Sequence, residues 1–189
     1  ASGKKEPVLS SLGSKRWSQQ KERVKKSTQV VVQDLVNMYA GRSQPRGFVY
    51  GKNDELYEAV EESFPYEETP DQAQAIQDVI QDMERDQPAD RLICGDVGFG
   101  KTEVALRATI KAVVSGKKVL LLSPTTILAD QHFISFSSRL EPVGVRIELL
   151  SRFKTKSEQL HIIEKMMRGT VDIVIGTHRL LSDDIRFPG

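Results

Sequence analysis

The sequence predicts an α/β fold, in which helices flank a parallel sheet and a long basic helix precedes them. Two observations lead to this prediction. After about residue 90, short apolar runs alternate with segments of helical periodicity, which is the pattern of consecutive βαβ units. Residues 15–40, by contrast, repeat apolar side chains at three- and four-residue steps without strand-like runs, so they are expected to form one helix.

The length and the charge distribution limit what the chain can be. Its 189 residues suffice for one α/β lobe of about 130 residues and an accessory segment. Residues 1–52 have a net charge of +8, residues 53–90 of −12 and residues 91–189 of +5, which indicates three segments with different surroundings. The basic first segment suits nucleic acid or an acidic partner, although a solvated helix face would show the same pattern.

The sequence offers no candidate for a membrane span or an internal disulfide. No apolar run approaches the ~18 residues that a span requires, so no membrane partner is expected. The single cysteine, Cys94, excludes a disulfide within the chain and fits an intracellular, reducing compartment. Because Cys94 lies in the apolar run 92–94, it is expected to be buried as a small hydrophobic side chain.

The first 53 residues are predicted to form a lead-in, a helix and a linker. Residues 1–14 are polar, with glycine, serine and proline, and are expected to be flexible. A long linker helix is predicted over residues 15–41, ending at Gly41, and a turn-rich linker over residues 42–53. The apolar face of this helix would consist of Trp17, Val24, Thr28, Val31, Leu35 and Met38.

The α/β lobe is predicted to extend from residue 54 to residue 189. It opens with an acidic helix over about 54–63 and a second helix over about 70–84, for which Thr69 is a suitable N-cap and Pro70 a suitable first residue. Buried parallel strands and intervening helices follow. The predicted strands are residues 91–94, 118–123, 145–150 and 171–175, and the predicted helices are residues 101–114, 126–139 and 156–168.

A phosphate-binding loop follows the first predicted strand and opens the next helix. Residues 95–102 read Gly-Asp-Val-Gly-Phe-Gly-Lys-Thr and fit the pattern G-x-x-x-x-G-K-[ST]. The glycines permit unusual backbone dihedrals, so that loop N–H groups and the helix N-terminus can face phosphate oxygens. Lys101 is expected to bind the β- and γ-phosphates of ATP and Thr102 to supply a hydroxyl for Mg²⁺, which makes them the candidate catalytic residues.

Several stretches in this order resemble the superfamily 2 helicases, and among them the transcription-repair coupling factor family of bacteria and plastid-bearing lineages. These stretches are residues 64–72, 90–105, 124–132, 150–153 and 175–178. The resemblance implies a RecA-like P-loop lobe. It also implies a nucleotide-binding set that consists of Phe64, Gln72, Gly95, Asp96, Val97, Gly98, Phe99, Gly100, Lys101, Thr102 and Glu103.

The resemblance assigns roles to residues outside the phosphate loop as well. Gln72 would read the edge of adenine, since one amide can pair with both a donor and an acceptor, and Phe64 or Tyr66 could stack on the base. Turns after the predicted strands would bind the phosphates of double-stranded DNA without reading its sequence. A metal-binding role for His178 is rejected, because no Cys/His cluster accompanies it. The DNA-binding candidates are Pro124, Thr125, Thr126, Arg152, Gly176, Thr177 and His178.

Hydrolysis of ATP in this class requires a D-E-x-x box and arginines from a second motor lobe, and the sequence shows neither. The acidic pair Asp183-Asp184 follows the fourth predicted strand in a polar turn, and the chain ends about where the next strand would begin. We therefore expect a fragment that binds nucleotide and hydrolyses little or none alone. The implied parent is an ATP-dependent DNA translocase or helicase of transcription-coupled repair, in the bacterial cytoplasm or a plastid. RNA polymerase and repair proteins would contact other parts of it.

Other functions stay open at this point. A RecG-like motor that remodels replication forks would share residues 95–98 and 176–178, although Phe99, residues 69–72 and the preceding helix favour the coupling factor. A non-catalytic fragment whose basic helix docks a protein partner is a second alternative. A P-loop kinase or GTPase is a third, but the sequence lacks the N-K-x-D pattern that selects guanine.

Overall fold

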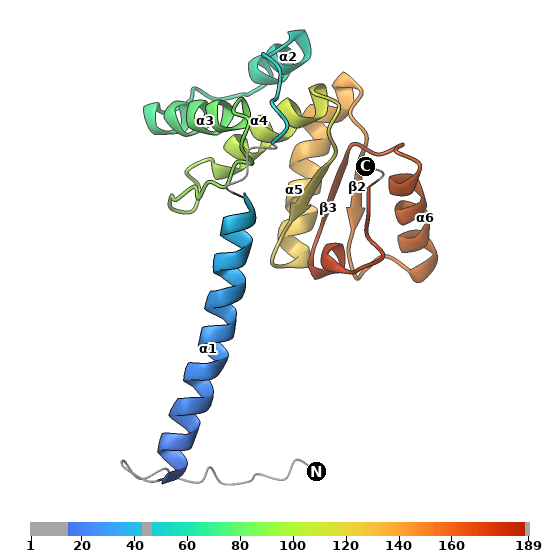
Figure 1. Cartoon of the computed structure of the whole chain (residues 1–189). Coiled ribbons are helices and arrows are strands. Elements are labelled where there is room, and N and C mark those ends of the chain that lie inside the picture. The colour runs from blue at the N-terminus through green and yellow to red at the C-terminus, as the bar shows by residue number, and fades with distance from the viewer. Residues whose placement is uncertain (1–14, 43–46, 188–189) are drawn as a thin grey trace. The chain divides into compact units, whose positions relative to one another are not determined.

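The computed structural model describes residues 15–42 and 47–187, which belong to two compact units divided between Pro45 and Arg46. The expected flexible lead-in, 1–14, lies outside the described residues, as do residues 43–46 of the expected linker. The first unit contains α1 (Lys15–Arg42), a helix of 28 residues. It is the long basic helix that the periodicity predicts (Figure 1).

The described side chains of α1 are exposed, including those of its expected apolar face. Val24 and Val31 are 66% and 56% exposed, and Leu35 is 45% exposed. An exposed apolar stripe of this kind commonly marks a contact surface.

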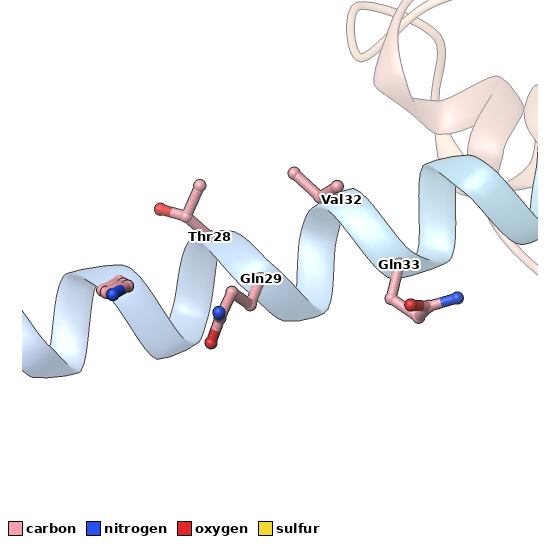
Figure 2. A pocket seen from close by; sticks show the side chains of 5 residues that line it. Thr28, Gln29, Val32 and Gln33 are labelled. Atoms are coloured by element: carbon pink, nitrogen blue, oxygen red, sulfur yellow. The ribbon is translucent and has the colours of Figure 1, made fainter.

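A shallow hollow runs along the middle of α1. Figure 2 shows that Thr28 and Val32 project from one side of the helix, whereas Gln29 and Gln33 project from the other. All of the residues that line this hollow belong to α1. A hollow bounded by one helix encloses no ligand, so it does not indicate a binding site.

A parallel sheet forms the centre of the second unit. In the part of the chain that the structure describes, the sheet has three strands, β1 (Val119–Leu122), β2 (Ile147–Leu150) and β3 (Ile173–Gly176), in the order β1-β3-β2. The last residues of all three strands are in register. Their carboxyl ends therefore meet at one edge of the sheet, which is where open α/β sheets bind their ligands.

Helices cover both faces of this sheet, as the alternating pattern predicts (Figure 1). α5 (Thr126–Leu140) lies on one face and α6 (Lys156–Met167) on the other. Successive residues of a strand point to opposite faces. Accordingly, Ile173 and Ile175 are buried in the core that includes α5, whereas Val174 is buried in the core that includes α6.

Further helices extend the first of these cores. They are α2 (Glu55–Glu62), α3 (Pro70–Met83) and α4 (Lys101–Val114). The start of α3 is as predicted, because Thr69 is its N-cap and Pro70 its first residue. The Thr69 hydroxyl accepts from the Gln72 N–H, and the Gln72 side chain accepts from the Thr69 N–H, which is a capping box.

Short 3₁₀ helices follow two of these elements. η1 (Glu141–Val143) comes directly after α5, and η2 (His178–Leu181) comes directly after β3. The chain turns back toward β2 at Gly144, whose φ of 87° is easily adopted only by glycine. None of the described helices combines the length and the apolar character that a membrane crossing requires.

The first predicted strand, residues 91–94, is not a strand in the structure. Leu92 is 86% exposed, and Cys94 is exposed, so the expectation that Cys94 is buried is wrong as well. The reason is pairing. β1 pairs with β3 on one side only, and on β1 Leu120 and Leu122 are 45% and 51% exposed. A strand requires a hydrogen-bonded neighbour, and the described residues place none beside residues 91–94.

Candidate functional site

The phosphate loop enters α4 through glycines with left-handed backbone dihedrals. Gly98 and Gly100 have φ values of 87° and 69°, which side-chain-bearing residues rarely adopt. Gly100 is the N-cap of α4, and a Cβ there would overlap the side-chain amide of Gln72. No side chain caps this helix, so its first N–H groups can face an anion.

Lys101, the first residue of α4, folds back over the loop. Its ammonium donates hydrogen bonds to the carbonyl oxygens of Gly95 at 2.5 Å and of Asp96 at 2.6 Å. Phosphate oxygens form stronger hydrogen bonds with an ammonium than carbonyl oxygens do. The ammonium can therefore exchange these partners for a phosphate. The neighbouring loop residue Val97 is 99% exposed and takes no part in the core.

Gln72 connects the start of α3 with the phosphate loop. Its Oε1 accepts from the Thr69 N–H at 2.9 Å, and its Nε2 donates to the Phe99 carbonyl at 3.0 Å. The structure therefore brings Gln72 beside the loop, where a residue that reads adenine is expected. Both ends of the amide already have protein partners, so a base would have to replace at least one of them.

A cavity of about 670 Å³ connects the two halves of the predicted nucleotide site. Its volume lies within the range of about 300–1,000 Å³ that is common for small-molecule pockets. The rings of Phe64 and Tyr66 meet edge to face in its wall, with centroids 5.6 Å apart. The remaining lining residues of the predicted set are Gln72, Gly98, Gly100, Thr102 and Glu103, and α5 adds Ser135, Ser138 and Arg139, which the sequence did not indicate.

A buried ion network fixes the cavity wall to α4. The guanidinium of Arg107, which is 1% exposed, lies 2.7 Å from Glu103 and 2.5 Å from Glu61. A third carboxylate, Glu68, accepts from it at 2.6 Å. Burial disfavours the charged guanidinium, but hydrogen bonds with Glu103 and Glu61 outweigh this effect and raise the pKa of Arg107. Glu103 in turn also pairs with Arg139 of α5.

Most of the predicted DNA-binding residues line one hollow at the carboxyl ends of the strands. Gly176 is the exception, since it is buried in β3 and a Cβ there would overlap the Leu150 carbonyl oxygen. It therefore sets the close approach of β2 and β3 and does not line the hollow. The hollow is lined by Pro124, Thr125, Thr126, Arg152, Thr177 and His178, together with Arg179 and Ser182, which the sequence did not indicate.

Arg179 of this hollow is held by an acidic residue that the sequence had singled out. Its guanidinium forms two hydrogen bonds with the Asp184 carboxylate, at 2.7 Å and 2.6 Å, which lower the pKa of Asp184. Arg152 and His178, by contrast, are exposed. Over residues 15–42 and 47–187, no cluster of three or more His, Cys, Asp or Glu that could hold a metal ion is found.

Comparisons with known proteins support the resemblance that the motifs carry. The DEAD/DEAH box helicase family matches residues 69–187. The transcription-repair-coupling factor of Bacillus subtilis (strain 168) is 49% identical over 181 residues, which are 96% of this chain and 15% of that protein. The protein of the same name from Staphylococcus aureus (strain USA300) is 46% identical over 99% of this chain and 16% of its own length. The chain thus spans about a sixth of these relatives.

Solved structures show the same fold. The structure of RecG bound to a three-way DNA junction superposes with a TM-score of 0.73 and 32% sequence identity, over 80% of this chain and 21% of that one. A hypothetical ATP-dependent RNA helicase from Sulfolobus tokodaii superposes with a TM-score of 0.53 at 19% identity, and it shares the fold. The expected RecA-like lobe is therefore confirmed. The family match covers most of the chain and includes the phosphate loop at residues 95–102. The chain therefore belongs to the DEAD/DEAH box helicase family.

Proposed function

We propose that this chain binds ATP with Mg²⁺ and is the first motor lobe of an ATP-dependent double-stranded DNA translocase in transcription-coupled repair. The observation that carries the proposal is the cavity that joins the phosphate loop to Phe64, Tyr66 and Gln72. Nucleotide binding is general in the helicase family to which the chain belongs. The similarity to transcription-repair-coupling factors over nearly the whole chain supports the role in repair.

The residues of the loop fit the phosphates of such a nucleotide. Gly98 and Gly100 leave the backbone N–H groups accessible, and the uncapped start of α4 adds a partial positive charge. Lys101 would move its ammonium from the Gly95 and Asp96 carbonyls to the β- and γ-phosphates. The Thr102 hydroxyl would bind Mg²⁺, which neutralises charge on the phosphates when bound.

The base would occupy the part of the cavity beside α3. Gln72 would exchange its bond to the Phe99 carbonyl for the edge of adenine, so that base binding is linked to a change in the phosphate loop. Phe64 or Tyr66 would stack on the base, since both rings line the same cavity. Selectivity for adenine over guanine would follow from the donor and acceptor of that one amide.

The hollow at the carboxyl ends of the strands is proposed to bind the DNA backbone. Threonine hydroxyls at Thr125, Thr126 and Thr177 can donate to phosphate oxygens, and the exposed Arg152 adds charge. Such contacts carry no base information, so binding would be independent of sequence and strongly salt-dependent. The likeness to RecG, whose structure was solved on a DNA junction, supports DNA as the ligand of this surface.

ATP hydrolysis is proposed to require groups beyond those that the described residues supply. Asp184 is engaged by Arg179, and no other acidic pair follows a described strand. A second motor lobe would supply arginines.

RNA polymerase and repair proteins are proposed as partners of the longer protein, which would act in the bacterial cytoplasm or in a plastid. A RecG-like fork-remodelling motor is the second candidate function. The structural likeness to RecG, with a TM-score of 0.73, supports this candidate.

The first test is nucleotide binding by the chain and its Lys101→Ala variant. Loss of a hydrogen-bonded charge of this kind costs about 1.5–3 kcal/mol, so the affinity for Mg·ATP should fall about 10- to 100-fold. Lys156→Ala, which removes an exposed lysine at the start of α6, should leave it unchanged. Fluorescence titration with a labelled ATP measures both. Equal affinities of the Lys101→Ala variant and the unmodified chain would refute the motor function and favour a non-catalytic, partner-binding fragment.

A further inference from the structure

Arg139 of α5 lies where three separate parts of the second unit meet. Its Nη1 pairs with the Glu103 carboxylate of α4, and its Nη2 donates to the Val60 carbonyl of α2 at 2.7 Å. Its Nε donates to the Ser63 hydroxyl at 3.2 Å, immediately after α2. The side chain is 14% exposed. Because the guanidinium is planar and rigid, these three bonds fix its orientation as well as its position.

The guanidinium of Arg139 lies over the ring of Phe64. The Cζ atom of Arg139 is 5.4 Å from the centroid of the ring, which is within the range of a cation–π contact. Phe64 lines the cavity and so does Arg139. The backbone N–H of the partly buried Phe64 donates to the Glu61 carbonyl at 3.1 Å, and its ring also meets that of Tyr66. The guanidinium is therefore the charged contact among those that hold the ring in place.

Glu103 links this arrangement to the phosphate loop. It lies in the first turn of α4, two residues after Lys101, and it is 5% exposed. Its other carboxylate oxygen accepts from Arg107, which also contacts Glu61 and Glu68 on either side of Phe64. The segment that carries the ring is thus held to the phosphate-binding helix by two arginines that share one carboxylate.

We propose that Arg139 is a positioning residue of the nucleotide site, which holds Phe64 against the base and sets the distance between the base wall and the phosphate loop. The inference rests on the proposed binding of ATP at this loop. It goes beyond that function by separating two contributions to affinity. Lys101 and the loop bind the phosphates, whereas Arg139 acts through Phe64 on the base alone.

The test compares ATP with inorganic tripolyphosphate, which has the phosphates and lacks the base and the ribose. Competition against a labelled ATP in the presence of Mg²⁺ gives both affinities for the unmodified chain and for Arg139→Gln. The affinity of this variant for ATP should fall about five- to tenfold, while its affinity for tripolyphosphate should stay within about twofold. Arg168→Gln is the matched control, since Arg168, the C-cap residue of α6, is 75% exposed and its substitution should change neither affinity.

Two more variants separate positioning from a general effect on folding. Arg139→Lys keeps the charge beside Glu103 and lacks the planar fork, so its affinity for ATP should lie between those of the unmodified chain and Arg139→Gln. Phe64→Ala should lower the affinity for ATP, and adding Arg139→Gln to it should lower it little further, since contacting residues are not additive. Thermal melts followed by circular dichroism identify any variant that has unfolded.

The outcomes distinguish this inference from the function on which it rests. An equal loss of affinity for ATP and tripolyphosphate in Arg139→Gln and Arg139→Lys overturns the positioning role, and so does full additivity with Phe64→Ala. If the unmodified chain binds neither ligand, or if Lys101→Ala has no effect, the nucleotide site itself is rejected. Both are supported if Arg139→Gln weakens the binding of ATP alone and Lys101→Ala weakens the binding of tripolyphosphate.

Discussion

Gly100 meets two separate steric demands, and Gly98 meets only one. Both have positive φ values, but a Cβ at Gly98 would find open space, whereas at Gly100 it would overlap the Gln72 amide. Substitution at Gly98 therefore introduces backbone strain alone. Substitution at Gly100 also displaces the side chain of Gln72, which completes the capping box of α3 and contacts the phosphate loop.

Gly100→Ala should weaken the binding of Mg·ATP more than Gly98→Ala does. Strain from a left-handed alanine is about 1 kcal/mol in each variant, which corresponds to roughly fivefold if the loop must bear it to bind. Displacement of Gln72 adds to this in Gly100→Ala only. Titration with labelled ATP provides the comparison. Gly51→Ala is the control, since Gly51 has open space and no positive φ. Equal effects at positions 98 and 100 would contradict the role given to Gln72.

At the scale of single elements, α5 and α6 both begin with a threonine N-cap, to which α6 adds a capping box with Glu158, and the two caps lie at different surfaces. Thr125 accepts from the Leu128 N–H at 3.2 Å, and Thr155 accepts from the Glu158 N–H at 3.3 Å. Thr125 also lines the hollow proposed to bind DNA, whereas Thr155 does not. The two threonines therefore separate the contribution of a helix cap from that of a ligand contact.

Thr125→Ala and Thr155→Ala should each lower the free energy of unfolding by about 1 kcal/mol, because each removes the hydroxyl that accepts from an N–H of the first helical turn. Only Thr125→Ala should also weaken binding of double-stranded DNA. Urea denaturation measures the first effect, and a mobility-shift assay at two salt concentrations measures the second. A similar loss of DNA binding in both variants would mean that stability, and not contact with phosphate, determines it.

The opposite end of the sheet depends on one carboxylate. Asp172, just before β3, accepts from Lys118 before β1 at 2.8 Å, and from the Arg146 guanidinium before β2 at 2.9 Å. Burial disfavours its ionised form, but these hydrogen bonds outweigh burial and hold the pKa of Asp172 well below its ordinary value. Asp172 thus connects the starts of all three described strands.

Because of this lowered pKa, part of the free energy of unfolding depends on pH. A carboxylate with a depressed pKa stabilises the folded state fully above its unfolded pKa of about 3.9, and the contribution is lost as the pH falls below that value. Asp172→Asn should therefore be less stable at pH 7, by about 1–3 kcal/mol. It should also lose less stability than the unmodified chain between pH 5 and pH 3. Urea denaturation at pH 7, pH 5 and pH 3 measures both effects. Asp86→Asn is the control, since Asp86 is exposed.

On the scale of the whole molecule, local signals in the sequence predicted more than long-range ones could. The starts of α3 at Pro70 and of α4 at Lys101 are encoded by neighbouring residues, and both were predicted correctly in position. Residues 91–94 have the composition of a strand, but strand formation depends on a neighbour that composition does not reveal. Cys94 is exposed for the same reason.

The buried ion network around Glu103 could not be predicted from the sequence, because most of its members are distant from one another along the chain. Glu103 and Arg107 are four residues apart on a helix, which is a recognisable spacing. Arg139 lies 36 residues from Glu103 and 76 from Ser63, and nothing in their local composition indicates a contact. That the residues proposed to bind DNA come together in one hollow was easier to predict, since the strand ends of a parallel sheet meet at one edge.

The one-sided pairing of β1 has a consequence for handling the chain in solution. The backbone donors and acceptors along its outer side, flanked by the exposed Leu120 and Leu122, form a template onto which any extended apolar segment can hydrogen-bond. Residues 91–94 have the apolar composition of such a segment, with Leu92 86% exposed, so a second copy of the chain can supply it. Because pairing between two molecules increases with concentration, dilute preparations should stay monodisperse longer than concentrated stocks.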